Sequence, residues 1–295
     1  MLDTIKHEIC SLLKSKVLID EPLKRHTTFG VGGVASLFIY PSDVNDLKII
    51  LKYSIKNKIK TFFMGSGSNL LVSDNGFDGI VICLRKSFKH FEVNDSLEAK
   101  IGTGVMLGHI VRTLTKSSVK GLESLIGVPG TLGGALIMNA GAYGSEISNY
   151  LVSIKSISLD GKEKLYFKDD LDFSYRYSSI PKNEIVVEAK FKFETGSLNQ
   201  IKIKKEKASQ SRRENQPLQF RSAGSIFKNP NINMAAGYLI DQANLKGTRI
   251  GDAEISTKHA NFIINHGNAS SNDILELIKI IKKKVLVQFK INLEL

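Results

Sequence analysis

Ser225 lies in a loop-like segment, RSAGSIFKNP (221–230), that combines a hydroxyl group with nearby cationic and amide side chains. Serine beside glycine is typical of turns, so a turn residue is the simplest interpretation of Ser225. The segment holds no histidine, aspartate or glutamate that could activate the hydroxyl as a nucleophile. The chemistry of Ser225 therefore depends on what the rest of the chain binds.

Glycine-rich segments predict such a ligand-binding region. After the strand-like run KTFF, the loop GSGSN (65–69) can form a nest of backbone N–H groups that suits a pyrophosphate. Its spacing matches neither the GxGxxG fingerprint of Rossmann folds nor the GxxxxGK[ST] motif of P-loops. Taken alone, GSGSN is equally compatible with a hairpin. The three segments are FGVGG (29–33), MGSGSNLLVSDNGFDG (64–79) and GVPGTLGGALIMNAGAYG (127–144).

The third segment begins with GVPGTLGG (127–134), in which Pro129 fixes a turn and large side chains are few. Such a stretch costs folding entropy unless something flat or bulky lies against it. Together with GSGSN, it indicates a large cofactor with a phosphate part and a flat part. A flavin dinucleotide fits that description better than a mononucleotide does.

The surrounding pattern predicts a mixed α and β chain. Residues 20–85 alternate strand-like runs, including ASLFIYP, NLLVS and GIVICL, with one helix-like run at 44–58. Residues 86–197 place the helical MLGHIVRTLTKSS and the strands EAKIGTG, LVSIKSISL and IVVEAKFKFE around the third glycine segment, with a hairpin turn at Asp160–Gly161. Near residue 198 a basic helix (200–214) begins, followed by a helix, a strand and a final amphipathic helix. We expect one domain at 1–198, in subdomains of about 1–85 and 86–198, and a second at 199–295.

Composition and charge exclude several classes of protein. The chain has 295 residues, 42% of them hydrophobic and 24% charged, and no apolar run long enough to cross a bilayer. Its first 16 residues predict a helix without the apolar stretch of a signal peptide, which favours the cytoplasm. Cys10 and Cys83 belong to no metal-binding or disulfide pattern, so we expect buried small hydrophobes and no metal.

The net charge of +12 permits a polyanionic partner, but the basic runs at 201–214 and 278–285 have helical periodicity with an apolar side. Solvated helix faces are the simpler interpretation of such runs. Attraction of a phosphate-bearing small substrate accounts for part of the remaining charge. The sequence shows no helix-turn-helix, zinc-finger or RNP-like motif, so nucleic-acid binding is the less favoured alternative.

Five motifs, taken in order, resemble the UDP-N-acetylenolpyruvoylglucosamine reductases of bacterial cell-wall synthesis. The resemblance extends from about Leu23 to the C-terminus, and the passage from Gln216-Pro217 to SAGSIF without a long insertion resembles the shorter, second type. An FAD-dependent oxidase or dehydrogenase of a small alcohol would share the fold, but SYRYS and SAGSIF argue against it. The motifs are GSGSNLLV (65–72), GVPGTLGGALIMNAGAYG (127–144), SYRYS (174–178), SAGSIFKNP (222–230) and GDAEISTKHANFIIN (251–265).

The resemblance implies an α+β FAD-binding fold of the vanillyl-alcohol-oxidase (PCMH) kind in two subdomains, with a C-terminal α+β substrate-binding domain. NADPH reduces the flavin and leaves, and UDP-N-acetylglucosamine enolpyruvate takes its place and is reduced to UDP-N-acetylmuramate. We expect a cytoplasmic monomer with a small-molecule substrate and neither a nucleic-acid nor a membrane partner. The implied FAD contacts are Gly65, Ser66, Gly67, Ser68, Asn69, Gly127, Gly130, Thr131 and Gly133.

The resemblance also assigns the catalytic groups. Ser225 donates a proton to C2 of the enolpyruvyl group, which explains why no histidine is needed beside it. Arg176 faces the substrate carboxylate as its charge grows toward an enolate. The family's catalytic glutamate, the second of an LExE pattern, would follow Leu295. Either the chain as given is truncated or this enzyme lacks the residue. Glu294 matches the first glutamate, and on an alternating strand it would point elsewhere.

Several other residues keep two interpretations each. His259 either lines the pocket or is a hydrogen-bonded structural histidine. Arg221 and Lys228 either meet the substrate diphosphate or are solvent-exposed loop cations.

Overall fold

The computed structural model describes residues 8–231 and 233–295 and forms two compact units. Unit 1 comprises the described residues up to 21, together with 35–66 and 78–210. Unit 2 comprises residues 22–34, 67–77 and 211–295. The boundary expected near 198 coincides with the start of helix α5 (Leu198–Asn215), and the two units divide within that helix.

Unit 1 contains a four-stranded sheet in the order β1 (Lys16–Pro22), β2 (Val34–Tyr40), β4 (Phe77–Cys83) and β3 (Thr61–Met64). Strands β3 and β4 are parallel. Helix α2 (Val44–Lys56) begins at Asp43, whose carboxylate caps the first turn by accepting a hydrogen bond from the Asp46 amide at 2.9 Å. The buried side of α2 shares a core with β2 and β4, as its apolar spacing predicts.

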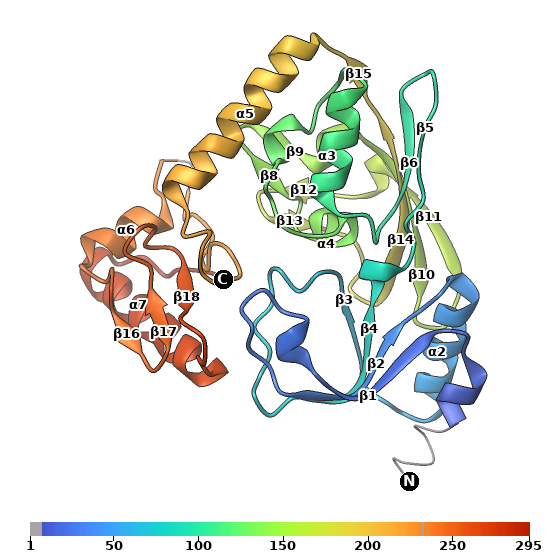
Figure 1. The fold of residues 1–295 in the computed structure, drawn as a ribbon, viewed down its shortest axis with the longest axis horizontal. Coiled ribbons are helices and arrows are strands. Elements are labelled where there is room, and N and C mark those ends of the chain that lie inside the picture. Colours follow the sequence, from blue (N-terminus) through green and yellow to red (C-terminus); the bar gives the residue numbers. More distant parts are fainter. Residues whose placement is uncertain (1–7, 232) are drawn as a thin grey trace. The chain divides into compact units, whose positions relative to one another are not determined.

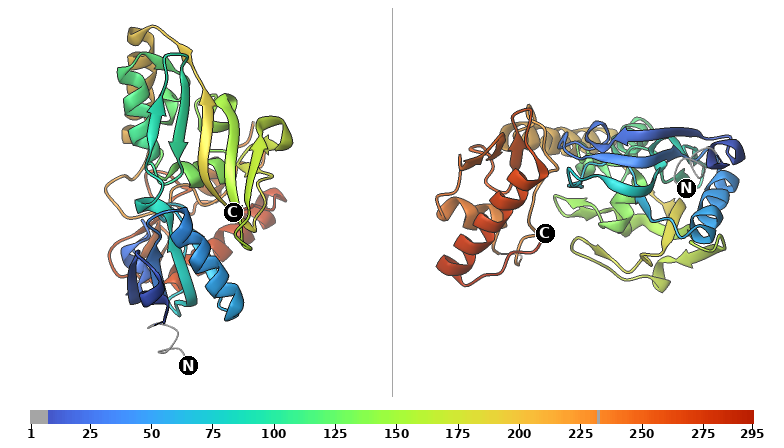
Figure 2. Two further views of the ribbon diagram at one scale, coloured as in Figure 1. Left: turned by 90° about the vertical axis from the view of Figure 1, so that its right-hand side faces the viewer. Right: turned by 90° about the horizontal axis from the view of Figure 1, so that it is seen from below.

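The second sheet of unit 1 is antiparallel, in the order β11 (Glu163–Phe167), β10 (Leu151–Ser158), β14 (Glu184–Lys192), β6 (Glu98–Gly102) and β5 (Phe91–Val93). The predicted hairpin turn between β10 and β11 is confirmed, with Gly161 at φ +83°. Helices α3 (Leu107–Lys116) and α4 (Leu132–Ile137) share one core with this sheet, as Figures 1 and 2 show for α3 on one face.

Short elements complete unit 1. Two-residue strands pair as β7 (Val119–Lys120) with β15 (Glu194–Thr195), β8 (Gly141–Ala142) with β9 (Ser145–Glu146), and β12 (Phe173–Ser174) with β13 (Tyr177–Ser178). Among the described residues, 3₁₀ turns occur in unit 1 at Leu84–Lys86, Glu123–Leu125, Ile147–Tyr150 and Lys168–Asp170, and in unit 2 at Leu23–Arg25. The buried residues of α5 are Ile201 and Ala208, which confirms that its basic face is solvated.

Unit 2 is built on a three-stranded antiparallel sheet of β16 (Arg249–Ile250), β17 (Ala253–Ile255) and β18 (Ile263–Asn265). Helices α6 (Ala236–Gln242) and α7 (Ser271–Phe289) contribute to the same apolar core, and α7 lies beside the sheet in Figures 1 and 2. A capping box between Ser270 and Asp273 starts α7. None of the helices in the described part of the chain is long and apolar enough to cross a membrane.

Three local expectations are wrong. NLLVS (69–73) is irregular, because the Ser73 carbonyl accepts a hydrogen bond from the Gly33 amide, 2.9 Å away, in place of a strand ladder. Residues 291–295 likewise form no strand. Cys10 is exposed on the helical turn 8–12, whose inward side is taken by Ile9, whereas Cys83 is buried as expected. The first part of the predicted N-terminal helix lies outside the described residues.

Candidate active site

In unit 1, two of the segments predicted to bind the cofactor meet. Gly65 follows β3, and a Cβ atom at Gly65 would lie 2.2 Å from Thr131 Oγ1. The Sγ of Cys83 donates to the Gly65 carbonyl at 3.2 Å, which anchors the start of the GSGSN loop to β4. Thr131 is 2% exposed. The two glycine-rich segments therefore touch at this point, with the Gly65 backbone against the Thr131 side chain.

The GVPGTLGG stretch is held by backbone hydrogen bonds to the connection between β6 and α3. The Leu107 amide donates to the Gly130 carbonyl at 2.9 Å, and the Gly133 amide donates to the Thr103 carbonyl at 3.0 Å. Gly127 and Gly130 have φ of +78° and +145°, backbone conformations that favour glycine. The shape of this loop is therefore fixed by the protein itself.

The predicted pyrophosphate loop spans the division between the units. Gly65 and Ser66 belong to unit 1, whereas Gly67, Ser68 and Asn69 belong to unit 2. In unit 2 the Gly67 carbonyl accepts a hydrogen bond from the Thr28 amide at 3.1 Å, and Gly67 has φ +66°. Thr28 lies directly before FGVGG, so the first two glycine segments of the sequence are neighbours in unit 2.

Arg176 occupies the tight turn between β12 and β13 in unit 1. Its φ of +54° is unusual for a residue with a side chain. The guanidinium donates from Nη2 to the Gly141 carbonyl at 2.9 Å, and its central carbon lies 5.0 Å from the centre of the Tyr175 ring. The hydrogen bond places the Arg176 guanidinium against the MNAGAYG loop (138–144), the last part of the third glycine-rich segment.

Asn139 ties that loop to the Arg176 turn and was not singled out from the sequence. The side chain is fully buried, with φ +40°. Its Nδ2 donates to Glu146 Oε2 at 2.7 Å and to the Ser174 carbonyl at 3.0 Å. An asparagine before Ala-Gly is the one sequence signal available, since asparagine tolerates positive φ.

Ser225 is exposed on a segment of unit 2 whose backbone pairs with Phe262 in an isolated β-bridge. Next to it, the Ile226 amide donates to the Asn261 carbonyl at 2.9 Å, and Phe227 is buried in the core. The serine hydroxyl therefore stands on a fixed backbone while remaining accessible to a ligand.

The other candidates of unit 2 surround this segment. Arg221 is exposed, and its side chain crosses Gly30 so closely that a Cβ there would lie 2.2 Å from Arg221 Nη1. The Lys228 amide donates to the Glu294 carbonyl at 2.8 Å, a single backbone hydrogen bond, which is fewer than a strand ladder needs. Burial lowers the pKa of His259, whose Nδ1 accepts a hydrogen bond from the Asn261 amide at 3.3 Å.

The predicted site residues fall into two groups, one in each unit. Arg176 lies in unit 1 and Ser225 in unit 2. Among residues 8–231 and 233–295, no group of three or more His, Cys, Asp or Glu side chains is arranged to hold a metal ion. The members in unit 1 are Gly65, Ser66, Gly127, Gly130, Thr131, Gly133 and Arg176, and those in unit 2 are Gly67, Ser68, Asn69 and Ser225.

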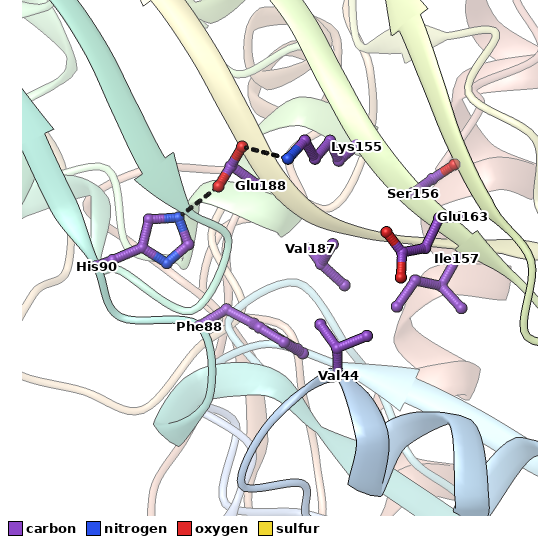
Figure 3. Close-up of a pocket in the computed structure, with 9 residues that line it drawn as sticks. All are labelled: Val44, Phe88, His90, Lys155, Ser156, Ile157, Glu163, Val187 and Glu188. Atoms are coloured by element: carbon purple, nitrogen blue, oxygen red, sulfur yellow. Dashed lines mark ion pairs between the residues drawn. The ribbon is translucent and has the colours of Figure 1, made fainter.

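A separate cavity of about 130 Å³ in unit 1 is lined by none of these residues. At its wall, Glu188 pairs with His90 Nε2 at 3.0 Å and with Lys155 Nζ at 3.6 Å (Figure 3). Phe88 and Val44 form its apolar side. The cavity belongs to the packing between α2 and the five-stranded sheet.

Comparison with known proteins identifies the family of this chain. Residues 35–164 match the family model described as an FAD binding domain, and residues 216–295 match the C-terminal domain of UDP-N-acetylenolpyruvoylglucosamine reductase. The crystal structure of UDP-N-acetylenolpyruvylglucosamine reductase (MurB) from Thermus caldophilus superposes with a TM-score of 0.81 at 33% identity, covering 95% of this chain and 97% of that one. The chain is therefore an FAD-dependent oxidoreductase with the expected α+β flavoprotein fold.

Curated relatives identify the family of the chain more narrowly. UDP-N-acetylenolpyruvoylglucosamine reductase from Bacillus pumilus is 39% identical over 99% of this chain and 96% of its own length. The enzyme of the same name from Clostridium novyi is 42% identical over 92% of this chain and 88% of its own length. The chain belongs to the UDP-N-acetylenolpyruvoylglucosamine reductase family.

Proposed function

We propose that Ser225 and Arg176 carry the chemistry of enolpyruvyl reduction in this chain. The chain is an NADPH-dependent flavoenzyme that reduces UDP-N-acetylglucosamine enolpyruvate to UDP-N-acetylmuramate in peptidoglycan precursor synthesis. Bound FAD supplies the hydride transfer from NADPH to C3 of the enolpyruvyl group. The observation that carries this function is the presence, in one chain, of both family matches together with the ordered SYRYS and SAGSIF motifs.

Ser225 protonates C2 of the enolpyruvyl group. Hydride addition at C3 leaves an electron pair at C2, and the Ser225 hydroxyl gives up its proton to that carbon and recovers one from solvent. A serine hydroxyl is a weak acid, but a carbanion is strongly basic, and a held donor gains from proximity. The exposed hydroxyl on a backbone paired with Phe262 supports this role.

Arg176 stabilises the charge that develops on the substrate carboxylate. The guanidinium carries a positive charge and presents a planar fork of donors. One donor is used to fix the group against the Gly141 carbonyl. The fork is thus oriented before substrate arrives, which is the condition for electrostatic stabilisation without reorganisation.

The glycine-rich loops hold the cofactor. We assign the pyrophosphate to Gly65, Ser66, Gly67, Ser68 and Asn69, and the isoalloxazine to the GVPGTLGG loop through Gly127, Gly130, Thr131 and Gly133. Within unit 1, the close approach of Gly65 to Thr131 supports a shared role for these two segments. We further infer a cytoplasmic monomer in which Arg221 and Lys228 contribute positive charge toward the substrate diphosphate.

Replacing Ser225 tests the proposal directly. The change Ser225→Ala should leave the rate of flavin reduction by NADPH within about twofold of wild type, because that step needs no proton at C2. Reoxidation by UDP-N-acetylglucosamine enolpyruvate should slow by roughly 100-fold or more, the scale of a lost general acid. Anaerobic stopped-flow absorbance separates the two steps. Equal rates of reoxidation in both proteins would remove Ser225 from the mechanism.

A further inference from the structure

Asn261 contacts the Ser225 segment more extensively than its place in the sequence suggests. It lies in KHANF, between His259 and β18, and is 4% exposed. Its side chain makes two hydrogen bonds to the backbone of one residue. The Phe227 amide donates to Asn261 Oδ1 at 2.9 Å, and Asn261 Nδ2 donates to the Phe227 carbonyl at 2.8 Å.

The backbone of Asn261 adds a third contact. Its carbonyl accepts a hydrogen bond from the Ile226 amide at 2.9 Å, and the next residue, Phe262, forms the β-bridge with Ser225. Residues 225–227 are thus held along their length by two consecutive residues, Asn261 and Phe262. The side-chain amide of Asn261 bonds to the Phe227 backbone as a peptide group of a neighbouring strand would. It thereby continues the pairing that begins at the bridge between Ser225 and Phe262.

Asparagine is well suited to this position. The buried Phe227 backbone presents a donor and an acceptor, and a primary amide satisfies both at once. Aspartate keeps the acceptor but sets a carboxylate against the Phe227 carbonyl, and alanine leaves both backbone groups unpaired in a buried setting. The Phe227 ring is anchored in the core of unit 2, so loosening the backbone there is transmitted toward Ser225 rather than absorbed by movement of the ring.

We infer that Asn261 is a positioning residue that holds the hydroxyl of Ser225 in place for protonation of the substrate. The inference rests on the proposed role of Ser225. It predicts that replacing Asn261 slows flavin reoxidation only when the Ser225 hydroxyl is present. A residue that only stabilised unit 2 would lower stability without acting selectively on the proton-transfer step.

A double-mutant cycle tests this. Asn261→Ala in the wild-type background should slow flavin reoxidation by UDP-N-acetylglucosamine enolpyruvate at least about tenfold, because small displacements of a catalytic group are costly. Reduction by NADPH should stay within about twofold. In the Ser225→Ala background the same change should have almost no further effect on reoxidation. Asn261→Asp should show the same pattern.

Two further measurements distinguish a local effect on the Ser225 segment from a general loss of stability in unit 2. Amide hydrogen exchange should show faster exchange at Phe227 in Asn261→Ala, whether or not the protein is turning over. The control Ser270→Ala removes the cap of α7, a helix of the same unit; it should lower the thermal midpoint while leaving both half-reactions unchanged.

Equal losses from Asn261→Ala in the wild-type and Ser225→Ala backgrounds would overturn the inference and leave Asn261 a structural residue. An unaffected Ser225→Ala enzyme would instead overturn the proposed role of Ser225 itself.

Discussion

Gly65 shows how closely single residues of this chain are matched to their surroundings. A Cβ added there would meet Thr131 Oγ1 at 2.2 Å and the Thr131 Cβ at 3.3 Å. Thr131 is buried and precedes α4, so its side chain has little room to move away. The two segments that we propose to hold the cofactor therefore approach as closely as they do because residue 65 has no side chain.

We expect Gly65→Ala to weaken FAD binding at least about tenfold, because overpacking of about 1–3 kcal/mol must be relieved by shifting the cradle. Titration of the apoprotein with FAD, followed by flavin fluorescence, measures the change. Gly108→Ala, in helix α3 with its nearest neighbour Arg112 Nη1 3.5 Å away, is the matched control and should bind FAD normally. Unchanged affinity in Gly65→Ala would argue against a cofactor contact at this point.

At the same scale, the sequence reveals some site residues and hides others. Ser225 and Arg176 stand in motifs that can be recognised along the chain. Asn139 and Asn261 act through hydrogen bonds to Ser174 and Phe227, which lie 35 and 34 residues away. An isolated asparagine in a loop is read as a turn former, and its partner is set only by tertiary structure.

Among the elements, β14 carries a buried carboxylate that links three strands. Glu184 accepts hydrogen bonds from Lys164 at 2.6 Å and Tyr166 at 2.9 Å on β11, and from Ser156 on β10. Burial alone would raise the pKa of Glu184, but these hydrogen bonds outweigh it and hold the pKa below its ordinary value. The folded state therefore binds this proton less readily than the unfolded chain does.

The stability contributed by Glu184 should be present above the unfolded pKa of about 4.5 and be lost as pH falls through the lower folded value. Glu184→Gln should lower the free energy of unfolding by roughly 1–3 kcal/mol at pH 7, and the difference from wild type should shrink below about pH 4.5. Urea unfolding at several pH values measures it. Glu92→Gln, at an exposed position of β5, is the control. A difference that stays constant with pH would contradict the assignment.

The long elements follow from periodicity, whereas the short ones do not. The apolar spacing of α2, α3 and α7 and the strand runs of β10 and β14 are sufficient to predict them. The pairs β7–β15 and β12–β13 have two residues in each strand, too few to show a period. The strands β7 and β15 lie far apart in the sequence, whereas β12 and β13 form a local hairpin around the turn at Tyr175 and Arg176. Residues 69–73 show the opposite case, an apolar run that resembles a strand but is irregular in the structure. There the Ser73 carbonyl accepts its hydrogen bond from Gly33 of the FGVGG segment.

At the scale of the whole molecule, the two units cut across the order of the sequence. Unit 2 gathers residues 22–34 and 67–77 with the C-terminal part, so the GSGSN loop begins in one unit and ends in the other. The sequence pattern predicts a boundary near 198, where the composition changes. It does not show that residues 22–34 and 67–77 pack with the C-terminal part. The function was nevertheless within reach of the sequence, because the motifs that carry it are long and ordered.

This chain transfers reducing equivalents from NADPH to an enolpyruvyl sugar nucleotide, as its family membership indicates. The most direct measurement is the absorbance spectrum of the purified protein under anaerobic conditions, first with NADPH and then with UDP-N-acetylglucosamine enolpyruvate. With this reaction, flavin bands should bleach with NADPH and return on addition of the sugar nucleotide. A colourless protein that cannot be reconstituted with FAD, or bands that NADPH leaves unchanged, would contradict it.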